Sequence, residues 1–512
     1  MVVAPEGRAS EAGLSVLMDG GSAVEAAIAA AAVLGVTYPH MTGIGGDAFW
    51  LVHQSGEAPV AIMGCGGAGS GATLDAYLGR KSIPVRGPMA ANTVAGAVSS
   101  WTKALGLPGA QRLPLPRVLQ EAIRLARDGA VEPPGLKRNV DAKSKELIDV
   151  PGWRDAFGNV PASGVRHFPR LAETLEMLAE DGLESFYSGA LAKRIASDLA
   201  SVNAPIILPD LEEHRATIET PLSVRLKDCI VYNTPPPTQG FASLLILALT
   251  ERMPEAETDS FEEVHAIVEA TKAAFVIRNE SVHDPKFMSL DCQGMLNDET
   301  ALDRMAASID TKRASPWPRS GGPGDTVWVG AADKDGCIVS MIQSLYFEFG
   351  SGVVLPHTGI LWQNRGASFR LTYHGWNALA PGRKPFHTLN PAFALFDDGR
   401  AMAYGNMGGE GQPQTQAAVF TRYARHGVDL ARAIDAPRWL LGRTWGDETT
   451  ALRIESRFDN RTIDALRNAG HPVQMTEEYS DLMGHAGAIV RYPDGGLDGA
   501  SDTRCDGETA CR

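Results

Sequence analysis

The stretch GDTVWVGAADKDGCIVSMIQS, residues 324–344, limits the fold more than any other part of the chain. Its apolar residues alternate up to Lys334-Asp335-Gly336, and a second apolar run follows. Asp-Gly between two such runs predicts a β-hairpin, with strands at 326–333 and 337–344. Thr326 then begins a strand directly after the glycine-rich loop 320–324. A threonine there reflects either β-propensity alone or a nucleophile that is exposed when the chain cuts itself.

The rest of the chain predicts helices and strands in irregular order. Residues 26–36, AAIAAAAVLGV, follow the S-x-x-E capping box of Ser22 and Glu25 and predict a buried helix. Helical periodicity dominates 116–200, and a further helix is expected near 413–425. Strands are expected at 58–63, 222–237, 353–363 and 391–405. The order lacks the βαβ alternation of a doubly wound sheet, and 512 residues suggest two closely packed halves or two domains.

Charge and cysteine usage exclude several classes of protein. The formal net charge of −14 argues against nucleic acid or an acidic membrane surface as a partner. The six cysteines form no C-x-x-C pair and have no zinc-site spacing, which favours free thiols in a reducing compartment over a Cys505–Cys511 bridge. No secretory signal is visible, and the longest apolar run is too short to span a bilayer. We therefore expect a cytoplasmic enzyme without a metal or cofactor.

Two glycine-rich stretches each allow a structural and a functional interpretation. GCGGAG, residues 64–69, matches G-x-G-x-x-G, but no helix pattern follows, so we interpret it as a turn. YGNMGGEGQPQTQ, residues 404–416, is either a tight turn or an oxyanion hole built from the backbone near Gly408 and Gly409. Arg127, near the end of a predicted helix, is by itself an ordinary surface cation.

Taken together, these stretches resemble the γ-glutamyltranspeptidase family of N-terminal-nucleophile hydrolases. The resemblance covers nearly the whole chain, in ordered blocks such as AIRLARDGAVEPP, NTPPPTQGFASLLILAL, DTVWVGAADKDGCIVSMIQS, FGSGVVLPHTGILWQN, PFHTLNPAFAL and GNMGGEG. It implies an α+β fold, the four-layer αββα sandwich. It also implies self-cleavage between Asp325 and Thr326, giving subunits 1–325 and 326–512 that stay together as an αβ heterodimer, with (αβ)2 as the larger alternative.

The resemblance assigns roles to residues of the implied site. Thr326 is the nucleophile, Ser344 carries the supporting hydroxyl, and the Gly408 and Gly409 amides hold the oxyanion. Arg127 matches the arginine that binds a substrate carboxylate. After cleavage the α-amino group of Thr326, with an ordinary pKa of about 7.7–8.0, would take the hydroxyl proton. Self-cleavage would use the same hydroxyl against the Asp325 carbonyl.

The chain departs from the family at its substrate-binding positions. Arg365 and Ser368 occupy positions where family members that act on γ-glutamyl groups hold the α-amino group, and an arginine repels an ammonium. Tyr346 replaces an asparagine, and His387 and Thr388 replace paired serines. The segment 369–385 is shorter than the family's lid. These changes resemble the amidohydrolase and acylase branch and predict an acyl group with a carboxylate but no α-amino group.

Three interpretations stay open on the sequence. The first is an autoprocessed threonine amidohydrolase that acts on a small acidic amide, either oxamate-like or glutaryl-like. The second is a γ-glutamyltransferase or glutathione hydrolase, in which Arg365 only forms a structural salt bridge. The third is a non-processing relative that binds a ligand.

Overall fold

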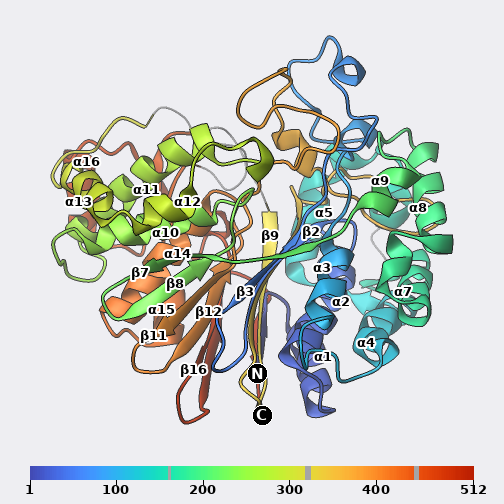
Figure 1. The fold of residues 1–512 in the computed structure, drawn as a ribbon, viewed down its shortest axis with the longest axis horizontal. Coiled ribbons are helices and arrows are strands. Elements are labelled where there is room, and N and C mark those ends of the chain that lie inside the picture. The colour runs from blue at the N-terminus through green and yellow to red at the C-terminus, as the bar shows by residue number, and fades with distance from the viewer. Residues whose placement is uncertain (159–162, 318–324, 443–448) are drawn as a thin grey trace.

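Two β-sheets packed face to face lie between two layers of helices, which is a four-layer αββα sandwich (Figure 1). The computed structural model describes residues 1–158, 163–317, 325–442 and 449–512. Within them the first sheet has seven antiparallel strands in the order β18-β1-β9-β10-β2-β3-β6, and the second has six in the order β17-β16-β12-β11-β8-β7. The mixed α+β class and the four layers predicted from the resemblance are therefore confirmed.

The strand bounds are as follows. The first sheet contains β18 (Glu508–Ala510), β1 (Val2–Ala4), β9 (Asp325–Ala332), β10 (Ile338–Tyr346), β2 (Asp47–His53), β3 (Val60–Gly64) and β6 (Thr217–Glu219). The second contains β17 (Leu497–Ser501), β16 (Ala486–Arg491), β12 (Ala401–Asn406), β11 (Ala392–Phe396), β8 (Cys229–Asn233) and β7 (Leu222–Arg225). Two small sheets are formed by β13 (Trp439–Leu441), β14 (Leu452–Glu455) and β15 (Val473–Thr476), and by β4 (Ala130–Val131) and β5 (Val165–Arg166).

The helices form one layer beside each large sheet (Figure 1). Beside the first sheet lie α1 (Gly7–Met18), α2 (Ala23–Thr37), α3 (Ala97–Leu105), α4 (Leu115–Asp128), α5 (Pro134–Leu147), α6 (Trp153–Phe157), α7 (Pro169–Asp181), α8 (Gly189–Ser201) and α9 (Leu208–Glu213). Beside the second lie α10 (Gly240–Glu251), α11 (Phe261–Ser281), α12 (Cys292–Asn297), α13 (Glu299–Ala307), α14 (Gly411–Phe420), α15 (Leu430–Asp435) and α16 (Asn460–Asn468). Short 3-10 turns include η3 (Leu183–Phe186), η5 (Arg365–Ser368) and η7 (Asp481–Met483).

Three apolar layers hold the sandwich together. One lies between the first sheet and its helices, and a second lies between the second sheet and its helices. The third lies between the sheets and includes Phe49, Trp328, Ile342, Phe393 and Ile489. Burial of apolar surface on both faces of each sheet is the main stabilising term. Because the inter-sheet layer is apolar and buried, a polar group at its margin lies in a low-dielectric environment.

Most predicted elements are present at nearly the predicted places. The hairpin forms as β9 and β10, with its turn at Asp333–Gly336, where Gly336 has φ 92°. The capping box of Ser22 and Glu25 starts the buried helix α2. The predicted helix near 413–425 is α14, followed by a π-helical turn at 421–425. The stretch 64–69 follows β3 as a loop, as expected. The loop predicted at 320–324 lies outside the described residues.

One predicted strand is wrong. Among the described residues, 353–363 make only isolated bridges, between Val354 and Leu361 and between Gly45 and Trp362. Pro356 cannot donate to a β-ladder, and Gly359 turns the chain with φ 68°. The predicted strand 391–405 is in fact a hairpin, because β11 and β12 are antiparallel neighbours.

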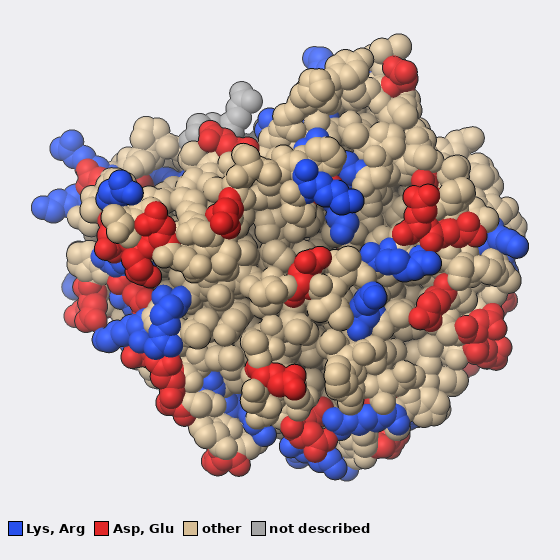
Figure 2. Space-filling model, viewed as in Figure 1, with Lys and Arg blue, Asp and Glu red and all other residues tan. Residues whose placement is uncertain are grey.

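The surface carries both signs of charge. On the face in Figure 2, Lys and Arg side chains are interspersed with Asp and Glu. Within the described part of the chain, no helix is long and apolar enough to cross a membrane. All six cysteines are free in the structure, and four of them are buried.

Candidate active site

A row of polar side chains crosses three neighbouring strands of the first sheet. Ser344 on β10 pairs directly with Asp47, the first residue of β2. On the other side of β10, Val327 of β9 pairs with Gln343 and the next ladder pair is Asp325–Tyr346, so Thr326 lies opposite the bulged residues Ser344 and Leu345. Residues paired across antiparallel strands project from the same face. Thr326, Ser344 and Asp47 therefore form one row.

The row faces the second sheet. Trp328, Ile342 and Phe49 belong to the inter-sheet layer, and each lies two residues from one member of the row. A period of two keeps side chains on one face of a strand. The polar row is therefore the margin of the apolar layer, and Thr326 is only 1 % exposed.

A β-bulge disturbs β10 next to the row. The register shifts between Gln343 and Tyr346, so that Tyr346 pairs with Asp325. Tyr346 has φ 86°, a strained value for a tyrosine, and its N–H donates to Ser344 Oγ at 2.8 Å. Bulges re-aim side chains beside functional sites. Here the bulge fixes the Ser344 hydroxyl and turns the Tyr346 ring toward Arg365.

The start of α14 meets Thr326. Gln412 Nε2 lies 3.4 Å from Thr326 Oγ1, and Gly408 and Gly409 precede the helix with φ 134° and 51°. Only glycine adopts such values readily. Main-chain N–H groups at a helix start favour an anion. The Gly408–Gly409 turn thus ends three residues before Gln412, whose side chain contacts the Thr326 hydroxyl.

A buried hydrogen-bond network holds this turn in place. Gln239 Nε2 donates to Gly409 O at 2.8 Å and to Thr388 O at 2.5 Å. Its Oε1 accepts from Arg278 Nη1 at 2.7 Å, and Arg278 also pairs with Glu410. Arg278 is fully buried. A satisfied network of this kind makes the turn rigid.

Arg365 is a buried cation at the same place. Its guanidinium lies 3.8 Å from the centre of the Tyr346 ring, and Nη1 donates to Thr388 Oγ1 at 3.3 Å. Nη2 has no hydrogen-bond partner among the described residues. Burial lowers the pKa of Arg365 to about 10, so it is charged at neutral pH. A charged donor without a partner is suited to an anionic ligand.

His387 and Asp47 complete the buried polar group. His387 Nε2 lies 3.6 Å from Asp47 Oδ2. Burial, and then the charge of Arg365, hold the pKa of His387 well below its ordinary range, so the contact is not an ion pair. Burial raises the pKa of Asp47 to about 7, although the charge of Arg365 opposes the rise. Asp47 Oδ2 and both His387 nitrogens have no hydrogen-bond partner within the described chain.

The structure does not bring every predicted residue to this group. The guanidinium of Arg127 is exposed at the end of α4 and pairs with Glu176 of α7, so the expected carboxylate-binding role is not supported by its position. A cation at a helix C-terminus needs no other explanation. Ser368 lies at the end of η5, where its Oγ donates to Phe386 O at 3.4 Å and accepts from Asn377 at 3.3 Å. It holds the neighbouring loop.

Sequence reasoning missed several residues of the site. Asp47 was visible only as the residue after Gly-Gly in GIGGDAFW, at the start of a strand. Gln412 follows the Gly408–Gly409 pair at helix-start spacing. Gln239 and Arg278 gave no signal, because their partners are distant in the chain.

The match to known proteins extends along almost the full length. A family model described as Gamma-glutamyltranspeptidase matches residues 9–511. The chain belongs to the γ-glutamyltranspeptidase family. Membership accounts for the four-layer fold, and the resemblance found in the sequence is confirmed.

Relatives within the γ-glutamyltranspeptidase family narrow the class of reaction. The chain is 51 % identical to an oxamate amidohydrolase proenzyme of Klebsiella pneumoniae, covering 100 % of this chain and 98 % of the relative. It is 41 % identical to a glutathione hydrolase-like proenzyme of Bacillus subtilis, covering 99 % and 97 %. The crystal structure of a cephalosporin acylase from Bacillus halodurans superposes with a TM-score of 0.90 at 33 % identity, covering 99 % and 94 %. The chain is an amide-bond hydrolase of the family.

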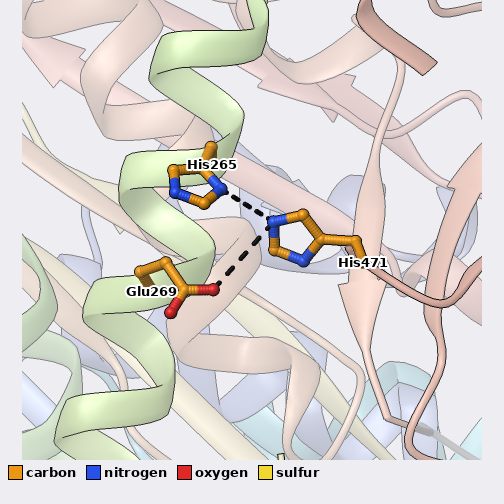
Figure 3. Close-up of side chains that lie close together, drawn as sticks. All are labelled: His265, Glu269 and His471. Atoms are coloured by element: carbon orange, nitrogen blue, oxygen red, sulfur yellow. Dashed lines mark hydrogen bonds and ion pairs between the residues drawn. The ribbon is translucent and has the colours of Figure 1, made fainter. Parts of the chain in front are cut away.

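A second polar cluster lies apart from this site, between α11 and the residues that follow α16 (Figure 3). His265, Glu269 and His471 are buried and close enough to suggest a metal site. His265 Nδ1 lies 2.8 Å from His471 Nε2, but the Lys272 ammonium is 2.6 Å from Glu269 Oε1. The lysine supplies the positive charge that a metal would bring.

The cluster and the neighbouring Lys272 also contact residues 310–315, which precede Asp325 in the chain. His265 Nε2 contacts Asp310 O at 2.8 Å, and Lys272 Nζ donates to Ser315 O at 2.7 Å. The Ser315 N–H in turn donates to Glu269 Oε2 at 3.1 Å. We therefore interpret the cluster as a hydrogen-bonded anchor for residues 310–315.

Proposed function

We propose that the protein is a precursor that cuts itself between Asp325 and Thr326 and then hydrolyses the amide bond of a small acidic substrate through Thr326. The observation that carries this is the contact of the Thr326 hydroxyl with Gln412 Nε2 at 3.4 Å, since Gln412 lies three residues after the Gly408–Gly409 turn. A nucleophile next to backbone donors is the arrangement that acyl transfer requires.

Self-cleavage begins with attack of Thr326 Oγ on the carbonyl carbon of Asp325. The C–N bond breaks, the acyl group moves to the oxygen, and the amine of Thr326 is released. Water then hydrolyses the ester and leaves a carboxylate on Asp325. The Tyr346–Asp325 pairing beside the bulge holds this peptide in the first sheet. The products are chains 1–325 and 326–512.

The new amine then serves the second reaction. It takes the proton from Thr326 Oγ as the oxygen attacks the substrate amide, and the N–H groups near Gly408 and Gly409 stabilise the oxyanion. The proton passes to the leaving nitrogen, the amine departs, and an ester remains on Thr326. Water releases the acid and restores the hydroxyl. An amine in place of water would give transfer.

The proposed substrate has a carboxylate on its acyl part. Arg365 is the cation that would bind it, with Nη1 on Thr388 and Nη2 available, and the Tyr346 ring supports the guanidinium plane. Likeness to the oxamate amidohydrolase and to the cephalosporin acylase agrees with a small acid amide.

One observation favours a second candidate, a γ-glutamyl hydrolase or transferase. Asp47 Oδ2 is a buried acceptor without a hydrogen-bond partner among the described residues, close to the charge of Arg365. A cation and an anion together suit a group that carries both a carboxylate and an ammonium. The sequence argued against γ-glutamyl substrates because Arg365 repels an ammonium, and it did not identify Asp47 as an acceptor for one.

The test combines intact mass spectrometry with three substrates. The purified protein should separate into two chains that divide at Asp325–Thr326, whereas a single species at 54.5 kDa after long incubation would refute self-cleavage. The cleaved protein is then given oxamate, a glutaryl amide and glutathione. Release of ammonia from oxamate or of glutarate supports the first candidate. Release of glutamate from glutathione alone supports the second.

A further inference from the structure

We propose that Asp47 is a resident carboxyl group that competes with the substrate carboxylate for Arg365, so that acidic amides bind to the form of the enzyme in which Asp47 carries a proton. The inference rests on the proposed acidic substrate. It makes Asp47 a specificity-determining residue.

The geometry divides Asp47 into a fixed oxygen and a free one. Oδ1 accepts from Gly96 N at 3.0 Å and from Gln363 Nε2 at 3.1 Å. These two donors hold the carboxyl plane at the start of β2. Oδ2 makes no hydrogen bond of ordinary geometry in the described chain; it faces His387 Nε2 at 3.6 Å, and the nearby Gly66 N–H lowers the pKa of the carboxyl group. Asp47 is 1 % exposed, so bulk water does not solvate this oxygen.

Arg365 has a matching unsatisfied atom. Its Nη1 bonds Thr388, and Nη2 has no hydrogen-bond partner among the described residues although the side chain is 1 % exposed. His387 has two such nitrogens and is fully buried. Buried polar atoms are nearly always paired, so several orphans in one place indicate a missing ligand or water. An anion would satisfy Arg365.

The charges that face Asp47 come from several elements. Arg365 of η5 favours the ionised carboxylate, and neutral His387 adds no charge. Cys65 after β3 and Tyr187 after η3 feel the charge of Asp47, and burial keeps both protonated at neutral pH. Lys384 acts on His387 and Cys65. Arg365 is therefore the main charge that acts on Asp47, although the two side chains form no direct ion pair among the described residues.

Competition follows from charge balance. With Asp47 ionised, the buried group contains one cation and one anion and is neutral. A substrate carboxylate would then add a second negative charge to a low-dielectric site, which is costly. With Asp47 protonated, the carboxylate becomes the counter-ion of Arg365, and the Asp47 O–H becomes a donor. Binding of the acid should therefore take up one proton whenever Asp47 starts ionised.

The test measures oxalate binding to the cleaved enzyme by titration calorimetry between pH 6 and 9. Since burial sets the pKa of Asp47 to about 7, affinity should fall by up to about tenfold per pH unit above 7. The titration is repeated at pH 8 in buffers of different ionisation enthalpy. The change in binding enthalpy between buffers gives the number of protons taken up per oxalate bound, which should be about one in the wild type. The new α-amino group of Thr326 also titrates in this range, so Asp47→Asn should take up about one proton fewer than the wild type, and its oxalate affinity should depend less steeply on pH.

A matched control is Asp198→Asn, a buried aspartate that accepts hydrogen bonds from His357 and Thr358 outside the site. It should keep the wild-type pH dependence. If Asp47→Asn does not fold, proton counting on Thr326→Ala decides, because that variant should stay uncut and has no new α-amino group. No proton uptake by the wild type, the same uptake in Asp47→Asn as in the wild type, or no oxalate binding overturns the proposal. Turnover is not measured here, so failure to hydrolyse acidic amides refutes the proposed function separately.

Discussion

Gln412 Nε2 lies 3.4 Å from Thr326 Oγ1, which connects the first turn of α14 beside the second sheet with the first residues of β9 in the other sheet. The same glutamine accepts from Asn390 N at 3.1 Å through its Oε1. One side chain thus fixes the hydroxyl of the proposed nucleophile relative to the Gly408–Gly409 turn.

Gln412→Glu should separate these two roles. Glutamate keeps an oxygen for Asn390 N but cannot donate to Thr326 while it is ionised. Because Gln412 is fully buried, an ionised carboxylate there should lower the melting temperature, and kcat should fall by at least about 3- to 10-fold, the equivalent of one ordinary hydrogen bond. Gln412→Ala should lower both the melting temperature and kcat, because it removes the donor to Thr326 and also leaves the Asn390 N–H unpaired. Wild-type kcat in both variants would show that the contact has no catalytic importance.

Thr326→Ala should give one uncut chain near 54.5 kDa and no amide hydrolysis, because the attacking hydroxyl is gone. Thr326→Ser is the matched variant, since it keeps the hydroxyl and should still be cut. A denaturing gel and intact mass report both results. Cleavage of Thr326→Ala at the same bond would rule out Thr326 as the nucleophile of self-cleavage.

Arg365→Gln should raise KM for an acidic amide by about 10- to 150-fold, which corresponds to about 1.5–3 kcal/mol for a hydrogen bond to a charged group. The KM of Arg365→Lys should lie between those of the wild type and Arg365→Gln, because lysine keeps the charge but loses the planar guanidinium group that stacks on Tyr346. Steady-state kinetics of the cleaved variants measure both.

Arg127→Gln tests whether Arg127 binds the substrate carboxylate, as the resemblance implies, or is an ordinary surface residue, as its position in the structure indicates. Its guanidinium is exposed and paired with Glu176, so KM should stay within twofold of wild type. A rise in KM as large as that of Arg365→Gln would restore the role that the resemblance gave to Arg127.

Asp47 should make stability depend on pH. Its pKa rises from 3.8 to about 7 on folding, so the folded state binds the extra proton between these values. The contribution of Asp47 to the free energy of unfolding is largest below about pH 4 and is lost as the pH rises to about 7. Asp47→Asn should therefore gain unfolding free energy relative to wild type on going from pH 4.5 to 7.5. Urea unfolding at both pH values measures the difference, and a constant difference would contradict the shift.

A chelator should leave the His265 cluster unchanged. Because Lys272 already balances Glu269, we expect the same melting temperature with EDTA or with added Zn²⁺. His471→Ala should instead lower the free energy of unfolding by about 1–3 kcal/mol, because the His265 imidazole loses its partner. A rise of several degrees with Zn²⁺ would show that a metal displaces the lysine.

The sequence by itself determined the elements and the family. Local signals were enough for the hairpin of β9 and β10, the capping box of α2 and the glycine turn before α14, because each depends on residues close together in the chain. The strand predicted at 353–363 failed although the sequence contains Pro356 and Gly359, the two residues that break it, because the prediction gave more weight to the apolar run.

Only the tertiary structure decided which side chains share the site. Asp47, Ser344 and Thr326 form a row because three strands pair side by side and a bulge in β10 lies opposite Thr326, and the packing of the second sheet brings His387 and Gln412 near them. The same packing sends Arg127 to the surface and buries Arg365. A pKa is set by burial and neighbouring charge, so the raised pKa of Asp47 has no local signature in the sequence.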